Sequence, residues 1–213
     1  YDPEAKSPAR RQALEDLIRY AGVEGAPLLV LGERGTGKTR LVETLVASIK
    51  RRSHVVTVPC GALDSSLAES ELFGHVKGAF TGAEAARRGL LGNADGGVLF
   101  LDEVQDLPKA VQRKMIRFLQ DRRRRYRQVG GDKELSTDAE VVCASNLSRT
   151  ELAKRLDPDL FDRLSHLVVA LPPLRICRED LPDDWARVWD ELRVSTDTPP
   201  EPPWSHELAT ALA

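Results

Sequence analysis

Eight consecutive residues have the composition of a loop that binds phosphate. Gly32 to Thr39 read Gly-Glu-Arg-Gly-Thr-Gly-Lys-Thr, which fits the pattern G-x-x-x-x-G-K-[S/T] without a mismatch. In such a loop the glycines let backbone N–H groups face phosphate oxygens, the lysine reaches the β- and γ-phosphates, and the last hydroxyl binds Mg²⁺. The residues predicted to contact a nucleoside triphosphate are Gly32, Glu33, Arg34, Gly35, Thr36, Gly37, Lys38, Thr39 and Arg40.

The flanking residues distinguish this motif from an accidental glycine turn. The apolar run 27–31 precedes it and has the length of a strand that is buried on both faces. A segment with apolar residues at helical spacing, 41–49, follows it. A strand, a tight turn and a helix in this order form the context that a phosphate-binding loop requires.

Two adjacent carboxylates follow another apolar run, 98–101. They are Asp102 and Glu103. In a parallel sheet the carboxyl ends of the strands open onto the ligand crevice, so we expect both side chains to face the phosphates. Asp102 would hold Mg²⁺ together with Thr39, and Glu103 would orient or polarise the attacking water. Acidic residues after a strand are common, and the pattern is informative here because the phosphate-binding loop precedes it.

Two further polar residues are candidates for the same site. Asn146 follows the apolar run 140–143 and could touch the γ-phosphate or the attacking water, or it could cap a helix near Thr150. Arg163 lies in a segment with helical character. It could stabilise phosphoryl transfer in a neighbouring subunit, or it could be an ordinary solvated or ion-paired arginine. The predicted catalytic residues are therefore Glu103, Asp102, Lys38, Arg163 and Asn146.

The rest of the chain predicts the frame for these residues. Short segments rich in apolar residues at 27–31, 55–58, 98–101, 140–143 and 167–171 indicate strands, and helical periodicity covers 7–20, 41–49 and 109–119. Among the residues expected to face inward are Ile18 and Leu119. Strands that alternate with helices predict an α/β fold, a three-layer sandwich around a mostly parallel sheet. We place the α/β core at 1–171 and a small, partial helical subdomain at 172–213, with Trp185 and Trp189 in its core.

Composition excludes several classes of protein. The chain has 213 residues and a net charge of −2, from 31 basic and 33 acidic side chains, so it has no overall attraction to nucleic acid or to an anionic membrane. No apolar run approaches the roughly 20 residues that span a bilayer, and a cytoplasmic location is expected. The four histidines lack metal-ligand spacing, so Mg²⁺ is the only metal predicted. The basic run Arg122–Arg125, with Arg127, reads as a solvated loop or as a patch that binds a partner protein.

Residues 69–83 resemble the signature of one family of ATPases. They read Glu-Ser-Glu-Leu-Phe-Gly-His-Val-Lys-Gly-Ala-Phe-Thr-Gly-Ala. The last six, Gly78, Ala79, Phe80, Thr81, Gly82 and Ala83, match the hallmark of the AAA+ domain of sigma-54-dependent transcription activators. Similar matches at 32–39, 94–103, 129–131 and 171–175 extend the resemblance over nearly the whole chain.

The resemblance implies a function for the chain. Members of this family hydrolyse ATP with Mg²⁺ and assemble into rings, hexamers or heptamers. The loop around Phe80 contacts sigma-54 in the RNA polymerase holoenzyme, and 130–135 resembles a second loop of the family. DNA would be bound only by a domain outside this chain. Because the chain begins without methionine, we expect it to be one module of a longer protein.

Three departures from the family pattern concern hydrolysis. Position 59 holds proline where the family has an asparagine that restrains the catalytic glutamate. The first of two arginines offered to the neighbouring subunit falls on Asp157, with Arg155 as a shifted substitute. The family's sensor arginine falls beyond Ala213. Two alternatives therefore stay open, namely a nucleotide-binding interaction module with little turnover and a remodelling ATPase with another client.

Overall fold

A parallel β-sheet organises the chain. The computed structural model describes residues 5–52 and 54–195, with side chains up to residue 190. In this part of the chain five strands form one sheet in the order β2-β3-β6-β1-β7, and every neighbouring pair is parallel. The strands are β1 (Leu28–Leu31), β2 (Val55–Pro59), β3 (Val98–Asp102), β6 (Glu140–Ser145) and β7 (Leu167–Ala170). The predicted α/β fold is confirmed.

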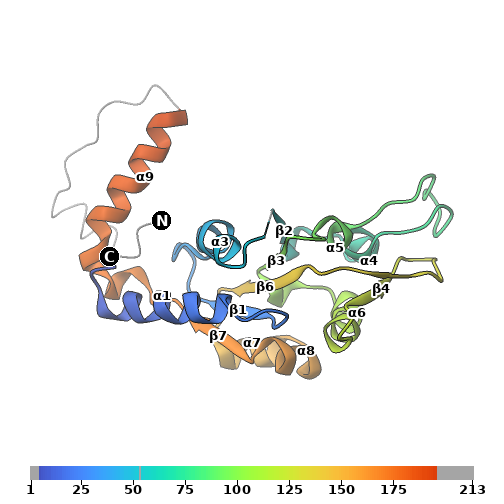
Figure 1. Ribbon diagram of the computed structural model, residues 1–213, viewed down its shortest axis with the longest axis horizontal. Helices are drawn as coiled ribbons and strands as arrows, with labels where there is room; N and C mark the ends of the chain where they lie inside the picture. The colour runs from blue at the N-terminus through green and yellow to red at the C-terminus, as the bar shows by residue number, and fades with distance from the viewer. Residues whose placement is uncertain (1–4, 53, 196–213) are drawn as a thin grey trace.

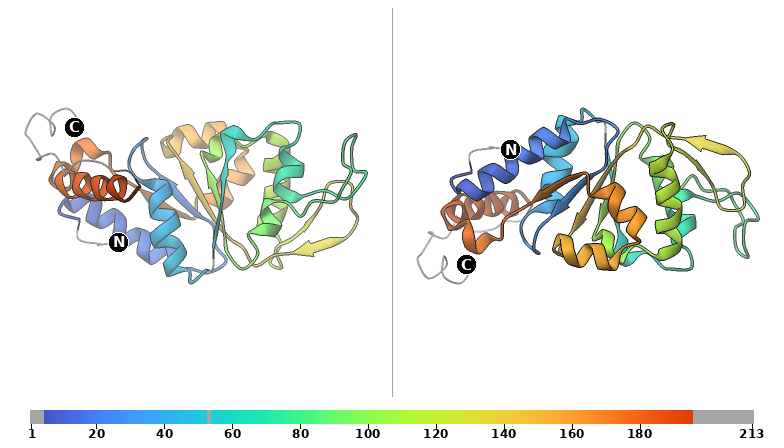
Figure 2. Two further views of the ribbon diagram at one scale, coloured as in Figure 1. Left: turned by 90° about the horizontal axis from the view of Figure 1, so that it is seen from above. Right: turned by 90° about the horizontal axis from the view of Figure 1, so that it is seen from below.

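The three central strands are apolar at successive positions because helices cover both faces of the sheet. In β1, Leu29 and Leu31 join the core on one face, and Leu28 and Val30 join the core on the other. Helices α4 (Ala68–Phe73), α6 (Lys109–Gln120), α7 (Arg149–Arg155) and α8 (Pro158–Leu164) cover the first face. Helix α1 (Pro8–Ala21) and the helix after the phosphate-binding loop cover the second, which gives three layers (Figures 1 and 2).

Helical periodicity located these helices but did not identify every residue that faces the core. Helix α1 begins after Ser7, with proline at its first position, as expected for that residue. Ile18 is 40% exposed, so its predicted inward position is wrong. In α6 the prediction put Leu119 inward, and this side chain is half-buried and packs against the core. The side chain of Gln112, which the pattern did not mark, is buried and bonds the backbones at Leu107 and Asp157.

The helix that follows the phosphate-binding loop is not uniform. Its first turn is α2 (Lys38–Leu41), a π-helical turn covers Val42–Val46, and α3 (Ala47–Ile49) completes it. Val42 and Val46 are fully buried against the sheet. The helix therefore starts at Lys38, directly at the loop, and its first turn is fixed by the packing of the turns that follow.

One loop and one hairpin project from the end of the molecule opposite α1 (Figure 1). The loop runs from α4 to α5 (Leu90–Asn93) and carries the Phe80 motif. The hairpin consists of β4 (Arg125–Arg127) and β5 (Glu134–Ser136), which pair antiparallel. The reading of the basic run as a solvated loop is wrong for this part, because alternate arginines there form a short strand around the buried Tyr126.

A helical segment follows the sheet. Two short 3-10 turns, Leu174–Ile176 and Arg178–Asp180, lead into α9 (Leu181–Ser195). Asp180 accepts the backbone N–H of Lys6, with 2.6 Å between nitrogen and oxygen, and Asp184 is ion-paired with Arg10, so this segment is tied to the start of α1. The proposed boundary near Pro172 stays a prediction. The last part of the predicted helical subdomain, 196–213, lies outside the described residues. None of the helices in the described ranges is long and apolar enough to cross a membrane.

Candidate active site

The phosphate-binding loop connects β1 to α2 and has the backbone that its glycines permit. Gly35 and Gly37 have φ angles of 82° and 84°, in the left-handed region that residues with a side chain rarely adopt. A Cβ atom at Gly32 would lie 2.8 Å from the hydroxyl of Thr36, which is closer than atoms can approach. The glycines are therefore required by the shape of the loop, and not only by the approach of a ligand.

Lys38 lies inside the loop. The side chain is 7% exposed, and its Nζ donates to the carbonyl oxygens of Gly32 at 2.7 Å and Glu33 at 3.0 Å. Burial lowers the pKa of Lys38, and the nearby carboxylates of Glu103 and Asp102 oppose that shift. The ammonium group is thus desolvated and held where a phosphate oxygen could replace the two carbonyls.

Thr39 and Asp102 meet across the loop. The Thr39 hydroxyl donates to Oδ2 of Asp102 at 3.2 Å, so the start of α2 and the end of β3 place two oxygen atoms side by side. Hydroxyl and carboxylate oxygens are ligands that Mg²⁺ prefers, and this ion commonly takes one or two protein ligands together with phosphate oxygens and water. The two residues fit the metal site that the sequence predicts.

Glu103 is held toward the neighbouring strand. Its backbone has a φ of 53°, unusual for a residue with a side chain. Its Oε2 atom accepts two hydrogen bonds, from Nε2 of Gln105 at 2.7 Å and from the backbone N–H of Asn146 at 3.1 Å. Because β3 and β6 are adjacent in the sheet, the ends of both strands contribute to one cluster.

Asn146 belongs to this cluster and does not cap a helix. Its Oδ1 atom accepts from Nε2 of Gln105 at 3.3 Å. The following helix, α7, begins after Ser148, whose hydroxyl accepts the N–H of Glu151 in a capping box. The capping alternative for Asn146 is therefore wrong. Sequence reasoning missed Gln105, since a glutamine after the acidic pair matches no motif.

A cavity opens next to the phosphate-binding loop. It has a volume of about 330 Å³ and lies between the loop, the N-terminal part of α1 and α9. Its lining residues include Gly35–Gly37, Arg40, Leu174 and Trp185. The volume lies in the range of small-ligand pockets, and its walls are mostly apolar, as suits the base of a nucleotide. Trp185 stacks on Trp189, with ring centroids 5.8 Å apart, and both are half-buried, so their predicted packing in the core of the helical subdomain stays a prediction.

An ion pair ties the loop to the segment after β7. Arg175 donates from both terminal nitrogens to the carboxylate of Glu33, at 2.6 and 2.8 Å. The arginine lowers the pKa of Glu33 by donating these hydrogen bonds. Glu33 is thus occupied by Arg175 in this structure, while its backbone carbonyl holds Lys38. The contact of Glu33 with the nucleotide stays a prediction.

Two of the three departures from the family pattern, Pro59 and Asp157, lie among the described residues. Pro59 pairs with Asp102 in the β2–β3 register and has no side-chain donor to offer. Asp157 caps α8, accepting the N–H of Asp159 at 3.0 Å, so it replaces an arginine with a helix cap. Arg163, on the same helix, is half-buried, and its Nε atom has no hydrogen-bond partner among the described residues.

The Phe80 loop is ordered by its own backbone. The N–H of Gly78 donates to the carbonyl of Ala83 at 2.8 Å, and both Gly78 and Gly82 have positive φ angles. Phe80 is 37% exposed, and its ring packs edge-on against His75 at 5.0 Å between centroids. The loop therefore presents an apolar side chain at the surface, at the end of the molecule away from α9 (Figure 1).

The loop between β4 and β5 supports the Phe80 loop. The N–H of Val76 donates to the carbonyl of Val129 at 3.1 Å, and the N–H of Val129 donates to the carbonyl of Gly74 at 2.9 Å. Gly130 approaches Ala79 so closely that a Cβ atom there would lie 2.7 Å from the Ala79 side chain. The Phe80 loop and the β4–β5 hairpin loop thus form one projecting unit.

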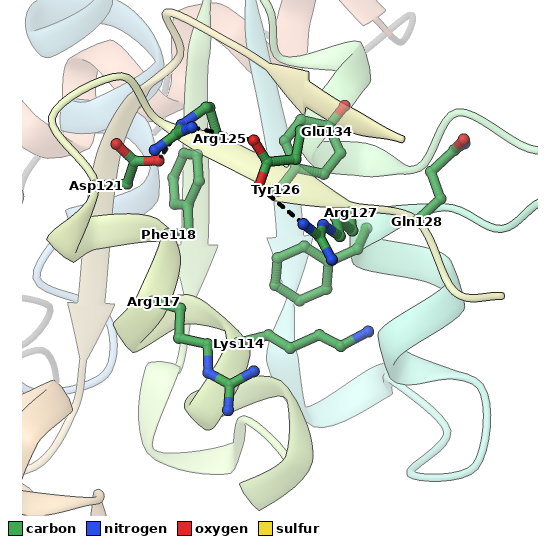
Figure 3. Close-up of a pocket in the computed structure, with 10 residues that line it drawn as sticks. Lys114, Arg117, Phe118, Asp121, Arg125, Tyr126, Arg127, Gln128 and Glu134 are labelled. Atoms are coloured by element: carbon green, nitrogen blue, oxygen red, sulfur yellow. Dashed lines mark hydrogen bonds and ion pairs between the residues drawn. The ribbon is translucent and has the colours of Figure 1, made fainter. Parts of the chain in front are cut away.

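A second cavity of about 410 Å³ lies between α6 and the hairpin (Figure 3). Its floor includes Phe118 and Tyr126, and charged side chains surround it. These charges are largely paired with one another: Arg125 binds Asp121 and Glu134, and Arg127 binds Glu134. Arg125 and Arg127 of the basic run are therefore ion-paired within the protein. Arg124 also turns inward, donating to the carbonyl of Gly25 at 2.5 Å.

Together the strand order, the loop between β1 and α2, and the acidic pair at the end of β3 define a P-loop NTPase of the AAA+ class. The sigma-54 interaction domain family matches residues 4–170. The chain belongs to this family.

Similarity to individual proteins agrees with this assignment. The alginate biosynthesis regulator AlgB of Pseudomonas putida is 41% identical over 181 residues, which cover 84% of this chain and 40% of AlgB. NtrX from Brucella abortus has a TM-score of 0.84 at 25% identity, over 99% of this chain and 48% of that chain. A structure of NtrX from Brucella abortus in complex with ATP has a TM-score of 0.74 at 28% identity, over 88% of this chain and 42% of that chain. The chain spans less than half the length of these proteins.

Proposed function

We propose that this chain is the ATP-hydrolysing module of a sigma-54-dependent transcription activator. The observation that carries the proposal is the convergence of Lys38, Thr39, Asp102 and Glu103 on one loop of a sigma-54 interaction domain. NtrX, which has the same fold, forms a complex with ATP. The module would act in the cytoplasm on the sigma-54 RNA polymerase holoenzyme, and DNA would be bound by a domain outside this chain.

Each residue of the site has a task in this proposal. The loop N–H groups and Lys38 bind the phosphates, and Nζ of Lys38 exchanges the Gly32 and Glu33 carbonyls for phosphate oxygens. Thr39 and Asp102 would hold Mg²⁺, which when bound neutralises charge on the phosphate oxygens. Glu103 orients and polarises the attacking water. Asn146, which shares Gln105 with Glu103, would contact that water or the γ-phosphate.

Assembly into a ring would complete the site. Arg163 is half-buried on α8, and in the ring it would stabilise phosphoryl transfer in the neighbouring subunit. We expect a non-hydrolysable ATP analogue with Mg²⁺ to convert the protein into a species of six or seven chains, because nucleotide would join adjacent subunits. Light scattering after size-exclusion chromatography measures this mass. A monomer at high protein concentration with saturating nucleotide would contradict it.

The Phe80 loop provides the test of the sigma-54 partner. Replacing Phe80 by alanine should weaken capture of sigma-54 by about 30-fold, since an exposed aromatic anchor commonly contributes 2 kcal/mol or more. ATP hydrolysis should stay unchanged, because the loop lies at the opposite end of the molecule from α9, which lines the cavity beside the phosphate-binding loop (Figure 1). The measurement is a pull-down with a transition-state analogue bound.

A matched control is available for this test. Ile18 is 40% exposed, close to the value for Phe80, but it lies on α1. Ile18→Ala should leave both sigma-54 capture and hydrolysis unchanged. Undiminished capture by Phe80→Ala would remove the loop from the interface and favour an AAA+ remodeller with another client.

A nucleotide-binding interaction module with little turnover is the second candidate. Pro59 beside Asp102, and Asp157 as a helix cap, are the observations that favour it. Phosphate release at a protein concentration that supports assembly separates the two candidates. Turnover that does not exceed the background of the Glu103→Gln variant would select the second.

A further inference from the structure

The cluster at the ends of β3 and β6 contains a residue with a defined orientation and no assigned role. Gln105 lies in the short turn after β3, Val104–Asp106, and is 9% exposed. Both ends of its side-chain amide are engaged. Its Oε1 atom accepts from the hydroxyl of Ser145 at 2.6 Å, and its Nε2 atom donates to Glu103 and to Asn146.

Ser145 determines which way this amide points. The Ser145 hydroxyl is fully buried and accepts the backbone N–H of Leu147 at 3.1 Å. Its own proton can then point at the oxygen of Gln105, and the flipped amide would instead place that oxygen against Oε2 of Glu103. The nitrogen of the amide consequently faces Glu103 and Asn146, where both partners offer oxygen atoms. The orientation of Gln105 therefore follows from hydrogen bonding and does not rest on the placement of two similar atoms.

This arrangement constrains one half of the Glu103 carboxylate. Oε2 receives both N–H donors, one from Gln105 and one from the backbone of Asn146. The described residues offer no hydrogen bond to Oε1, so this oxygen is available to a water molecule. On β2, the neighbour of β3 on the side away from β6, Pro59 pairs with Asp102 and has no side-chain donor to offer. Gln105 is thus the side chain that orients Glu103.

We infer that Gln105 is a positioning residue for ATP hydrolysis. It fixes the carboxylate of Glu103 and links it to Asn146, so that the group that polarises water and the polar end of β6 move together. This inference rests on the proposed ATPase activity and adds a residue that no family motif supplies. A carboxylate that is held by two donors loses less entropy when it orients water, and misplacement by about 1 Å can reduce a rate by about 100-fold.

Replacing Gln105 by methionine tests the inference. Methionine keeps the length of the side chain and fills the buried site, but it removes the amide donor. We expect kcat to fall by about tenfold or more, while KM and the Kd for Mg-ATP change less than twofold, because no contact with the nucleotide is lost. Ser145→Ala should reduce kcat in the same direction by a smaller factor. Gln120→Ala, on the exposed end of α6, is the matched control and should leave all three constants unchanged.

A second measurement needs no nucleotide. If Gln105 bonds Glu103, the drop in Tm caused by Gln105→Met should be larger in the wild-type background than in Glu103→Ala, where the partner is absent. Equal drops in the two backgrounds would overturn the hydrogen bond on which the inference depends. This readout also applies to any variant whose turnover is too low to measure.

The outcomes separate this inference from the proposed function. Wild-type hydrolysis with an unchanged kcat in Gln105→Met would overturn the positioning role and leave the ATPase proposal intact. A higher kcat in Gln105→Met would also overturn it, because Gln105 would then restrain Glu103. Absence of hydrolysis in the wild type would overturn the proposed function and the positioning role together.

Discussion

Replacing Glu103 by glutamine should lower ATP turnover by about a thousandfold while Mg-ATP still binds. The amide has the size of the carboxylate, and its oxygen can accept the N–H groups of Gln105 and Asn146 that now reach Oε2. It lacks the negative charge that polarises water. Because Lys38, Thr39 and Asp102 are unchanged, the Kd should stay within about twofold, the size of effect expected when no ground-state contact is lost.

Phosphate release and calorimetry measure the two halves of this prediction. Glu15→Gln is the matched control, since Glu15 is exposed on α1 and makes no contact with the site. Undiminished hydrolysis in Glu103→Gln would remove Glu103 from the mechanism. Loss of both binding and turnover would instead show that the carboxylate supports the loop, for example through its attraction to Lys38.

Lys38→Ala should weaken Mg-ATP binding by about 100-fold, because hydrogen bonds to charged groups contribute about 1.5–3 kcal/mol each. The ammonium group is already desolvated and bonded to two carbonyls of the loop, so little reorganisation is needed when phosphate replaces them. The lysine also offsets the adjacent carboxylates of Asp102 and Glu103. Without it, those carboxylates would repel the phosphates.

Calorimetry with purified protein measures this affinity, and thermal unfolding verifies that the variant is folded. Lys154→Ala, which removes an exposed lysine from α7, is the control and should bind Mg-ATP as the wild type does. Binding of Mg-ATP that does not depend on Lys38 would contradict the nucleotide site. The sigma-54 proposal would then lose its source of energy, whatever the behaviour of Phe80.

Much of the fold could be predicted because its signals are local. The central strands β1, β3 and β6 are buried on both faces and therefore appear as apolar runs that need no knowledge of their neighbours. The edges of helices were less predictable, since periodicity marks a stripe but does not show how far the sheet extends beneath it. Ile18 at 40% exposure is one example.

The hairpin was missed for a related physical reason. Its first strand, Arg125–Arg127, has two arginines around one buried tyrosine, and a single apolar residue gives no pattern. What stabilises it is contact between side chains, because Tyr126 packs with the distant Phe73 and with Phe118 and the arginines pair with Glu134 and Asp121. The sequence of the basic run suggested free charge, while the structure shows Arg125 and Arg127 paired with carboxylates.

The sequence by itself determined the phosphate-binding loop, the acidic pair and the family, since each is encoded by contiguous residues whose chemistry does not depend on distant partners. Only the tertiary structure decided how Glu103 is held. Parallel pairing of β3 with β6 brings Asn146, 43 residues away in sequence, to the carboxylate of Glu103. The same pairing lets Ser145 orient Gln105. Hydrogen bonds depend on distance and direction in space, which the spacing of residues along a chain does not reveal.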